Sequence, residues 1–74
     1  MAASQITDRE TLVNGGATSP TFEVYRRASG RVRVFWYYFE QDGARAETVA
    51  TFREADWPKA VGRAREHVRR YLEE

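Results

Sequence analysis

The chain has no cysteine, a single histidine (His67) and a single lysine (Lys59) among its 74 residues. Without cysteine there is no disulfide, thiolate nucleophile or thiolate metal ligand, and one histidine cannot build a multi-histidine metal centre. Gly15-Gly16 lacks the strand–loop–helix context of a phosphate-binding loop. We therefore predict a protein that is not an enzyme, with no catalytic residue, metal, cofactor or small-molecule substrate, and we expect His67 at the surface, half-exposed.

Long apolar runs are also missing. No run approaches the roughly 20 residues of a transmembrane helix, and the N-terminus lacks the basic region and apolar core of a signal peptide. We therefore expect a cytoplasmic protein that does not bind a membrane. The net charge is only +1 and is spread evenly along the chain, whereas dedicated nucleic-acid binders usually carry a strong basic excess.

What the chain does have is ten aromatic residues, enough to give so short a sequence a core. Residues 1–20 are mostly small and polar, and we predict a flexible N-terminal arm there, followed by a single βββα domain over 21–74. The few apolar residues of the arm (Ile6, Leu12 and Val13) leave open that it docks on the body of the protein.

From Thr21 the side chains alternate with period two, which predicts strands over 21–27, 31–40 and 44–52. The separators Ala28-Ser29-Gly30 and Gln41-Asp42-Gly43 each predict a three-residue turn ending in a left-handed glycine. In the first hairpin the predicted partners are Phe22 and Trp36, Val24 and Val34, and Arg26 and Val32. In the second they are Glu40 and Ala44, Tyr38 and Ala46, Trp36 and Thr48, Val34 and Ala50, and Val32 and Phe52.

A C-terminal amphipathic helix is predicted after Asp56, a good N-cap, with Pro58 in the first turn. Its apolar residues recur every three or four positions, and we expect Gly62 to let the helix approach Trp36. The expected stripe is Trp57, Ala60, Val61, Ala64, Val68, Tyr71 and Leu72. The predicted fold class is therefore α+β, a three-stranded antiparallel β-meander with one C-terminal amphipathic helix packed on one face.

The register divides the sheet into two faces. Towards the helix it places Phe22, Val24, Val32, Val34, Trp36, Tyr38, Ala46, Ala50 and Phe52. The other face combines aromatic and arginine side chains with Val49 and two acids, Glu23 and Glu47. The candidate partner-binding residues on it are Tyr25, Arg27, Arg31, Arg33, Phe35, Tyr37, Phe39 and Arg45. Such side chains stack on bases and neutralise phosphates, but they are equally typical of protein–protein interfaces. Two other ways of burying this face remain possible: the N-terminal arm could lie over Phe35 and Tyr37, or a homodimer could bury two such faces.

Three segments resemble a known module: Tyr25–Val34, Asp42-Gly43-Ala44-Arg45, and Thr51-Phe52-Arg53 with a helix following. Over residues 22–65 the chain is similar to the arm-type DNA-binding domain of tyrosine recombinases and to the related AP2 domain. The resemblance implies a three-stranded sheet, backed by a helix, that reads double-stranded DNA with its open face. The contacts that it implies are Arg27, Arg31, Arg33, Tyr37 and Arg45.

Two functions follow. The first is a small non-catalytic protein that binds a protein partner through the aromatic and arginine-rich sheet face. In scale it resembles phage or mobile-element accessory, regulatory or inhibitor proteins. The second is a DNA-binding module that uses the same face. The near-neutral charge and the two acids on the face favour the first.

Overall fold

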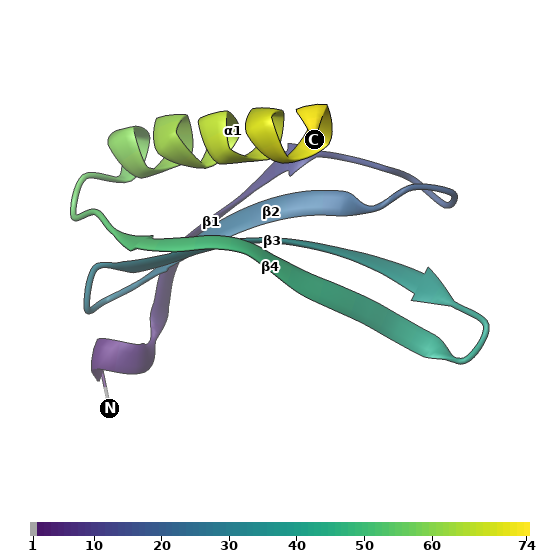
Figure 1. The fold of residues 1–74 in the computed structure, drawn as a ribbon. Coiled ribbons are helices and arrows are strands. Elements are labelled where there is room, and N and C mark those ends of the chain that lie inside the picture. The colour runs from purple at the N-terminus through teal and green to yellow at the C-terminus, as the bar shows by residue number, and fades with distance from the viewer. Residues whose placement is uncertain (1) are drawn as a thin grey trace.

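The computed structural model describes residues 2–74, which form one four-stranded sheet and one long helix (Figure 1). The elements are the 3-10 turn η1 (Ala2–Ser4), the strands β1 (Ile6–Val13), β2 (Thr21–Arg27), β3 (Arg31–Glu40) and β4 (Gly43–Arg53), and the helix α1 (Trp57–Glu73). The strands are antiparallel and lie in chain order. The α+β class and the single C-terminal helix are thus confirmed, but the sheet has four strands where three were predicted.

The additional strand is β1, which lies where we expected a flexible arm. It pairs along the edge of β2, so that it extends the sheet and does not fold over its face. Polar contacts tie it down: Asp8 accepts hydrogen bonds from Nε and Nη2 of Arg26, at 3.0 and 2.7 Å, and Glu10 forms a 2.9 Å ion pair with Arg65 of the helix. A prediction based on apolar anchors missed β1 because backbone pairing and ion pairs hold this strand more than buried apolar side chains do.

The hairpin of β2 and β3 has the predicted register, with Phe22 opposite Trp36 and Val24 opposite Val34. Its turn ends in Gly30, whose φ of 91° lies in the left-handed region and whose N–H donates to the carbonyl of Arg27 at 2.9 Å. Glycine adopts this conformation without steric cost. The three-residue turn at 28–30 is therefore confirmed.

The hairpin of β3 and β4 departs from the prediction in its outer half. Val34 faces Ala50 as expected, but a bulge follows. Beyond it the observed partners are Thr48 for Phe35, Glu47 for Trp36, Ala46 for Tyr37, Arg45 for Tyr38, Ala44 for Phe39 and Gly43 for Glu40. Val49, the extra residue of the bulge, packs against the core, and the connecting loop shortens to residues 41–42.

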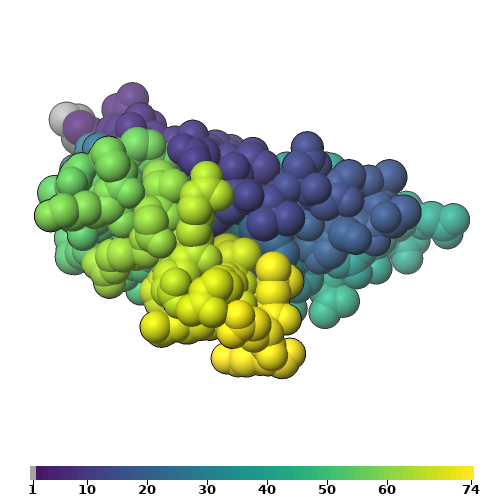
Figure 2. Space-filling model, turned by 90° about the horizontal axis from the view of Figure 1, so that it is seen from above, coloured from purple at the N-terminus to yellow at the C-terminus, as the bar shows by residue number. Residues whose placement is uncertain are grey.

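Because one inserted residue exchanges the two faces of a strand, the bulge moves Arg45 and Glu47 to the helix side and Ala46 to the opposite side. The predicted three-residue loop places Glu47 on the face away from the helix, outside the core. The structure keeps that charge in solvent differently: the outer half of this hairpin extends beyond the helix (Figures 1 and 2), and all of residues 41–48 are exposed.

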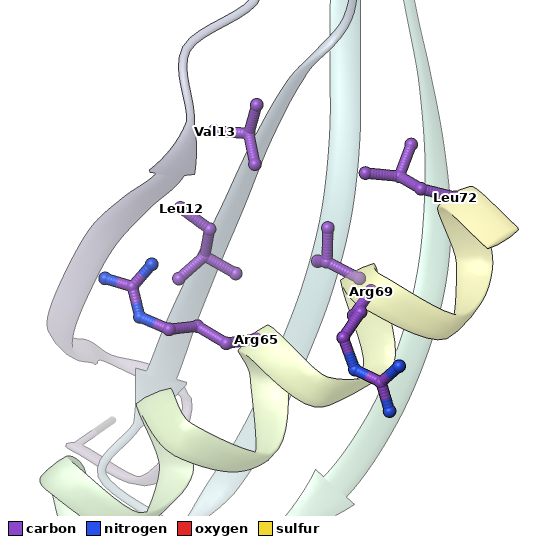
Figure 3. A pocket seen from close by; sticks show the side chains of 6 residues that line it. Leu12, Val13, Arg65, Arg69 and Leu72 are labelled. Atoms are coloured by element: carbon purple, nitrogen blue, oxygen red, sulfur yellow. The ribbon is translucent and has the colours of Figure 1, made fainter.

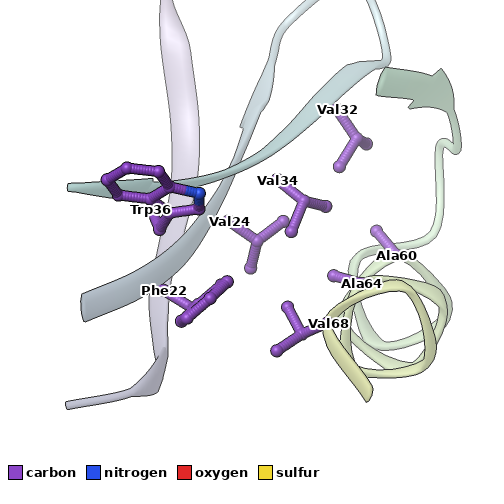
Figure 4. Close-up of a cluster of buried hydrophobic side chains, with 8 residues drawn as sticks. All are labelled: Phe22, Val24, Val32, Val34, Trp36, Ala60, Ala64 and Val68. Atoms are coloured by element: carbon purple, nitrogen blue, oxygen red, sulfur yellow. The ribbon is translucent and has the colours of Figure 1, made fainter. Parts of the chain in front are cut away.

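The core lies between the sheet and α1, as Figure 4 shows. Val24, Val32 and Val34 are completely buried beneath the helix, and Nε1 of Trp36 donates to the hydroxyl of Tyr71 at 2.9 Å. The residues of the buried cluster are Phe22, Val24, Val32, Val34, Trp36, Ala60, Ala64 and Val68. The prediction that β3 uses its even-numbered side chains for the core is therefore confirmed.

Small helix residues allow this close packing, but Gly62 is not one of them. Ala60 and Ala64 are fully buried against the sheet, whereas a Cβ placed on Gly62 would meet no atom within 4 Å. The expectation that Gly62 lets the helix approach Trp36 is wrong. Asp56 precedes the helix as predicted and its carbonyl accepts from Ala60 N–H at 2.9 Å, but its side chain makes no capping bond.

Candidate binding face

Within residues 2–74, the sheet surface that faces away from α1 carries only the short turn η1, at the end near residues 28–30, and is otherwise left open (Figure 1). We call this surface the open face. From the strand registers it consists of Ile6, Arg9, Thr11, Thr21, Glu23, Tyr25, Arg27, Arg31, Arg33, Phe35, Tyr37, Phe39, Ala44, Ala46, Thr48, Thr51 and Arg53. Seven of the eight predicted partner-binding residues therefore share this face. Arg45 does not, because the bulge turns it to the helix side, where its guanidinium lies 5.9 Å from the Trp36 ring.

A row of four aromatic rings runs across the open face, mostly along β3. Tyr25 meets Phe35 edge-on at 5.7 Å between ring centroids, Phe35 stacks with Tyr37 at 6.1 Å, and Tyr37 meets Phe39 edge-on at 5.9 Å. Along β3, exposure rises from 8% at Phe35 to 74% at Phe39. The row is therefore buried at Phe35 and exposes the ring of Phe39 to solvent at its outer end.

Arginine guanidinium groups lie over the rings of the inner part of this row. The guanidinium of Arg33 sits 4.8 Å from the Phe35 ring centroid, and its Nε donates to Oγ1 of Thr48 at 2.8 Å. The guanidinium of Arg27 lies 5.0 Å from the Tyr25 ring and also donates to the carbonyl of Ser4. Cation–π stacking and hydrogen bonds thus fix the direction of both groups before any partner arrives.

Glu23 is a buried carboxylate on the open face, with a relative exposure of 6%. Arg9 donates to it from Nε at 2.7 Å and pairs through Nη2 at 2.6 Å, and the hydroxyls of Tyr37 and Thr11 lie 3.0 and 3.5 Å away. A buried charge is tolerated where an opposite charge and hydrogen bonds compensate it. Because Arg9 and Thr11 come from β1, the strand missed from the sequence completes this network.

Arg9, Thr11 and Arg53 belong to the face but were not among the predicted residues. Because residues 7–11 are all polar, the alternation of apolar and polar side chains that would have revealed β1 is absent from the sequence. Arg53 lies opposite Arg31, one residue beyond the predicted end of the last strand.

Two tyrosines of the row have pKa values shifted in opposite directions: that of Tyr37 is raised and that of Tyr25 is lowered. The hydrogen bond to Glu23 raises the pKa of Tyr37, since ionisation would place two negative charges side by side. Burial alone would raise the pKa of Tyr25, but hydrogen bonds and charge from Arg33 and Arg27 outweigh it and lower that pKa. The open face is thus electrostatically positive around Tyr25 and carries the negative charge of Glu23 beside Tyr37.

Charge is segregated between the two sides of the molecule. Among residues 2–74 the open face carries five arginines and one acid, a net charge of +4. The rest of the chain then carries seven basic and ten acidic side chains, a net charge of −3. The even distribution along the sequence therefore conceals a dipolar molecule, and the move of Glu47 to the helix side removes one of the two acids predicted on the face.

A groove lies on the other side of the sheet, between β1 and the C-terminal half of α1 (Figure 3). It has a volume of about 260 Å³ and is lined by Leu12, Val13, Arg65, Val68, Arg69 and Leu72. Its arginines already have carboxylate partners: Arg65 pairs with Glu10, and Arg69 with Glu66 and Glu73. This groove offers apolar area but little uncompensated charge, so the open face is the stronger candidate.

Other site types find no support in residues 2–74. No group of three or more histidine, cysteine or acidic side chains could hold a metal ion there, and His67 is half-buried with its ring stacked 5.6 Å from that of Phe52. No helix in the described part of the chain is long and apolar enough to cross a membrane. Comparisons with protein-family models, curated proteins and solved structures gave no match.

Proposed function

We propose that this chain is a small non-catalytic binding protein that uses the open face to bind a protein partner with an acidic surface. The observation that carries the proposal is the aromatic row with its arginines already fixed in position. A protein with one such surface acts by occupying its partner, which is how accessory, regulatory and inhibitor proteins work.

The layout of the face resembles a protein–protein interface. Aromatic residues and arginine dominate interface hot spots, which lie at a dry centre surrounded by a polar rim. Here the rings of Phe35 and Tyr37 form the centre, while Arg9, Arg31 and Arg53 lie towards the margins. Because Arg33 is already held by Phe35 and Thr48, little side-chain entropy remains to be lost on binding.

Double-stranded DNA is the second candidate, and the segregated charge is the specific observation in its favour. Near-neutral net charge argued against a nucleic-acid partner, but a face with a net charge of +4 presents the field that phosphates require. Each guanidinium has five N–H donors, so Arg33 keeps donors for a phosphate besides the one given to Thr48. A sheet face can enter the major groove.

The test compares two exposed apolar residues on opposite sides of the molecule. Phe39 is 74% exposed on the open face and Leu72 is 60% exposed near the end of α1, so neither Phe39→Ala nor Leu72→Ala disturbs the buried core. The wild type, both variants and Arg31→Glu are used to capture proteins from the native host after nuclease treatment. The same four proteins are titrated with duplex DNA at several salt concentrations.

We expect a captured protein whose binding falls at least tenfold with Phe39→Ala and with Arg31→Glu but is unchanged with Leu72→Ala. DNA as the partner would instead give binding that nuclease treatment removes, with log K falling by about 0.9 per log unit of salt for every phosphate contacted. If Phe39→Ala and Arg31→Glu change neither kind of binding, the open face is not the functional surface.

A further inference from the structure

We propose that the outer edge of β4 pairs with the same segment of a second copy of the chain, in a two-fold antiparallel ladder centred on Ala46. This contact uses the backbone groups of an edge strand, so it leaves the aromatic row of the open face uncovered and does not rest on the function proposed for that face. The occupant is a second copy because the charges along the edge complement themselves.

β4 is an open edge. It is the last strand of the sheet, and residues 43–48 are all exposed. The helix does not cover this end of the hairpin (Figures 1 and 2). Exposed edge strands have unpaired N–H and C=O groups and readily pair with other chains unless charge, proline or bulges prevent it. Residues 43–48 contain no proline, and the bulge at Val49 lies beyond them.

The charges of this edge match in a two-fold ladder. With Ala46 opposite Ala46 of the second copy, Arg45 lies directly opposite Glu47 of the second copy, and Glu47 opposite its Arg45. Opposite charges placed directly across an antiparallel pair stabilise it. Within one chain these two side chains are only loosely paired, at 3.7 Å, and each is more than half exposed, so both are available to a neighbour.

Backbone geometry agrees with this register. Hydrogen-bonding directions alternate along an antiparallel strand, and Glu40 faces Gly43 across the two-residue loop. If that closing pair is hydrogen-bonded, Arg45 and Glu47 bond inward to β3, while Ala44, Ala46 and Thr48 direct their N–H and C=O groups outward. Arg45 and Glu47 then occupy non-hydrogen-bonded positions across the new ladder, where facing side chains come closest.

The charges of β1, the strand at the other edge of the sheet, do not complement those of a second copy of β1. A two-fold ladder that keeps the faces aligned must be centred on one residue, which meets its own copy. Near the middle of β1 that residue is Asp8, Arg9 or Glu10, and each choice sets like charges against each other. In β4 the central residue is the uncharged Ala46, so self-pairing is favoured at one edge and opposed at the other.

Such a dimer would form a continuous eight-stranded sheet. The two-fold axis is perpendicular to the sheet, so both open faces point to the same side and both helices to the other. Three strand spacings separate the two copies of β3, so the aromatic rows lie roughly 14 Å apart. The dimer therefore presents two copies of the open face to one partner surface.

Analytical ultracentrifugation of the full chain over a range of concentrations tests the pairing. We expect a reversible dimer whose dissociation constant rises at least tenfold with Arg45→Glu or with Glu47→Arg alone. A mixture of these two single variants should form heterodimers, and the double swap Arg45→Glu/Glu47→Arg should dimerise like the wild type. Arg31→Glu, which changes the net charge as much as Arg45→Glu does, should leave the dimer unchanged.

Circular dichroism shows that each variant is folded, and the recovery in the mixture excludes simple unfolding as the cause. Three results would overturn the proposal: a wild type that stays monomeric up to about 1 mM, a dimer indifferent to Arg45→Glu, or single variants that do not recover on mixing. None of these bears on partner capture through Phe39, so the two proposals stand or fall separately.

Discussion

At the residue scale, Glu23 joins three other side chains of the open face through hydrogen bonds and an ion pair. Its carboxylate links three strands, since Arg9 and Thr11 come from β1, Glu23 itself from β2, and Tyr37 from β3. A buried carboxylate whose donors are removed costs about 1–3 kcal/mol or more. Arg9 therefore has a structural role as well as a place on the candidate interface, unlike Arg31 at the margin.

Tyr25 and Tyr37, the two tyrosines beside this network, should have pKa values on opposite sides of the ordinary value of 10.0. Tyr37 keeps its proton to higher pH because its hydroxyl donates to Glu23. Tyr25 loses its proton at lower pH, since the hydrogen bonds and charges of Arg33 and Arg27 outweigh its burial. NMR titration of the tyrosine ring carbons gives both pKa values. In Glu23→Gln the pKa of Tyr37 should fall, and a pKa of Tyr37 that does not respond would contradict the assigned hydrogen bond.

At the scale of elements, alternation and turn chemistry predict β2, β3 and most of the helix. Phe22, Val24 and Val34 leave only one register that buries them together, and Gly30 sets the turn between them. β1 could not be predicted in this way because residues 7–11 are all polar and its side chains are held by pairs with other elements: Asp8 meets Arg26 of β2, and Glu10 meets a helix residue 55 positions away. Local patterns contain no information about such pairs.

The sequence placed seven of the eight candidate residues on the correct face of the sheet. It misplaced Arg45, for one identifiable reason. The seven depend only on the parity of β2 and β3. Arg45 depends on the loop length and on the absence of a bulge in β4, and the chain uses a shorter loop with a bulge at Val49. The two alternatives differ by a single residue in the pairing, which hydrophobic alternation in an exposed hairpin does not determine.

The helix can be stabilised at Gly62. This residue lies within α1, and an added Cβ would meet nothing within 4 Å. Because glycine costs about 0.5–1 kcal/mol relative to alanine in a helix interior, Gly62→Ala should raise the midpoint of thermal unfolding by about 2–8 °C. The matched control is Gly30→Ala, which should lower it because φ at Gly30 is +91°. A neutral or destabilising Gly62→Ala would show that the glycine has a role in packing.

At the scale of the whole molecule, the segregation of charge matters more than its sum. A net charge of +1 suggests a molecule indifferent to charged surfaces, yet one side holds four net positive charges and the remainder three net negative ones. Fields of this kind orient a protein as it approaches a charged partner and accelerate association at low salt. Binding through the open face should therefore depend on salt whichever class of partner it takes.

Ion-exchange chromatography measures this asymmetry without a partner. On a cation-exchange resin at neutral pH, the protein should bind through the open face. Arg31→Glu should then elute at clearly lower salt than Arg70→Glu, although the two substitutions change the net charge equally. Arg70 lies on the helix beside Glu66, on the negative side of the molecule. Equal elution of the two variants would contradict the segregation.

The meander order of the sheet has a consequence for how the chain folds. Each strand pairs with its neighbour in sequence, across residues 14–20, 28–30 and 41–42, so every hairpin closes a short loop at small entropic cost. Sequence-distant closure is needed where α1 packs back across the sheet, as in the pair of Arg65 with Glu10 and the hydrogen bond from Trp36 to Tyr71. Because folding rates fall as contacts become more distant in sequence, the four strands can assemble quickly, and docking of α1 on the sheet completes the core.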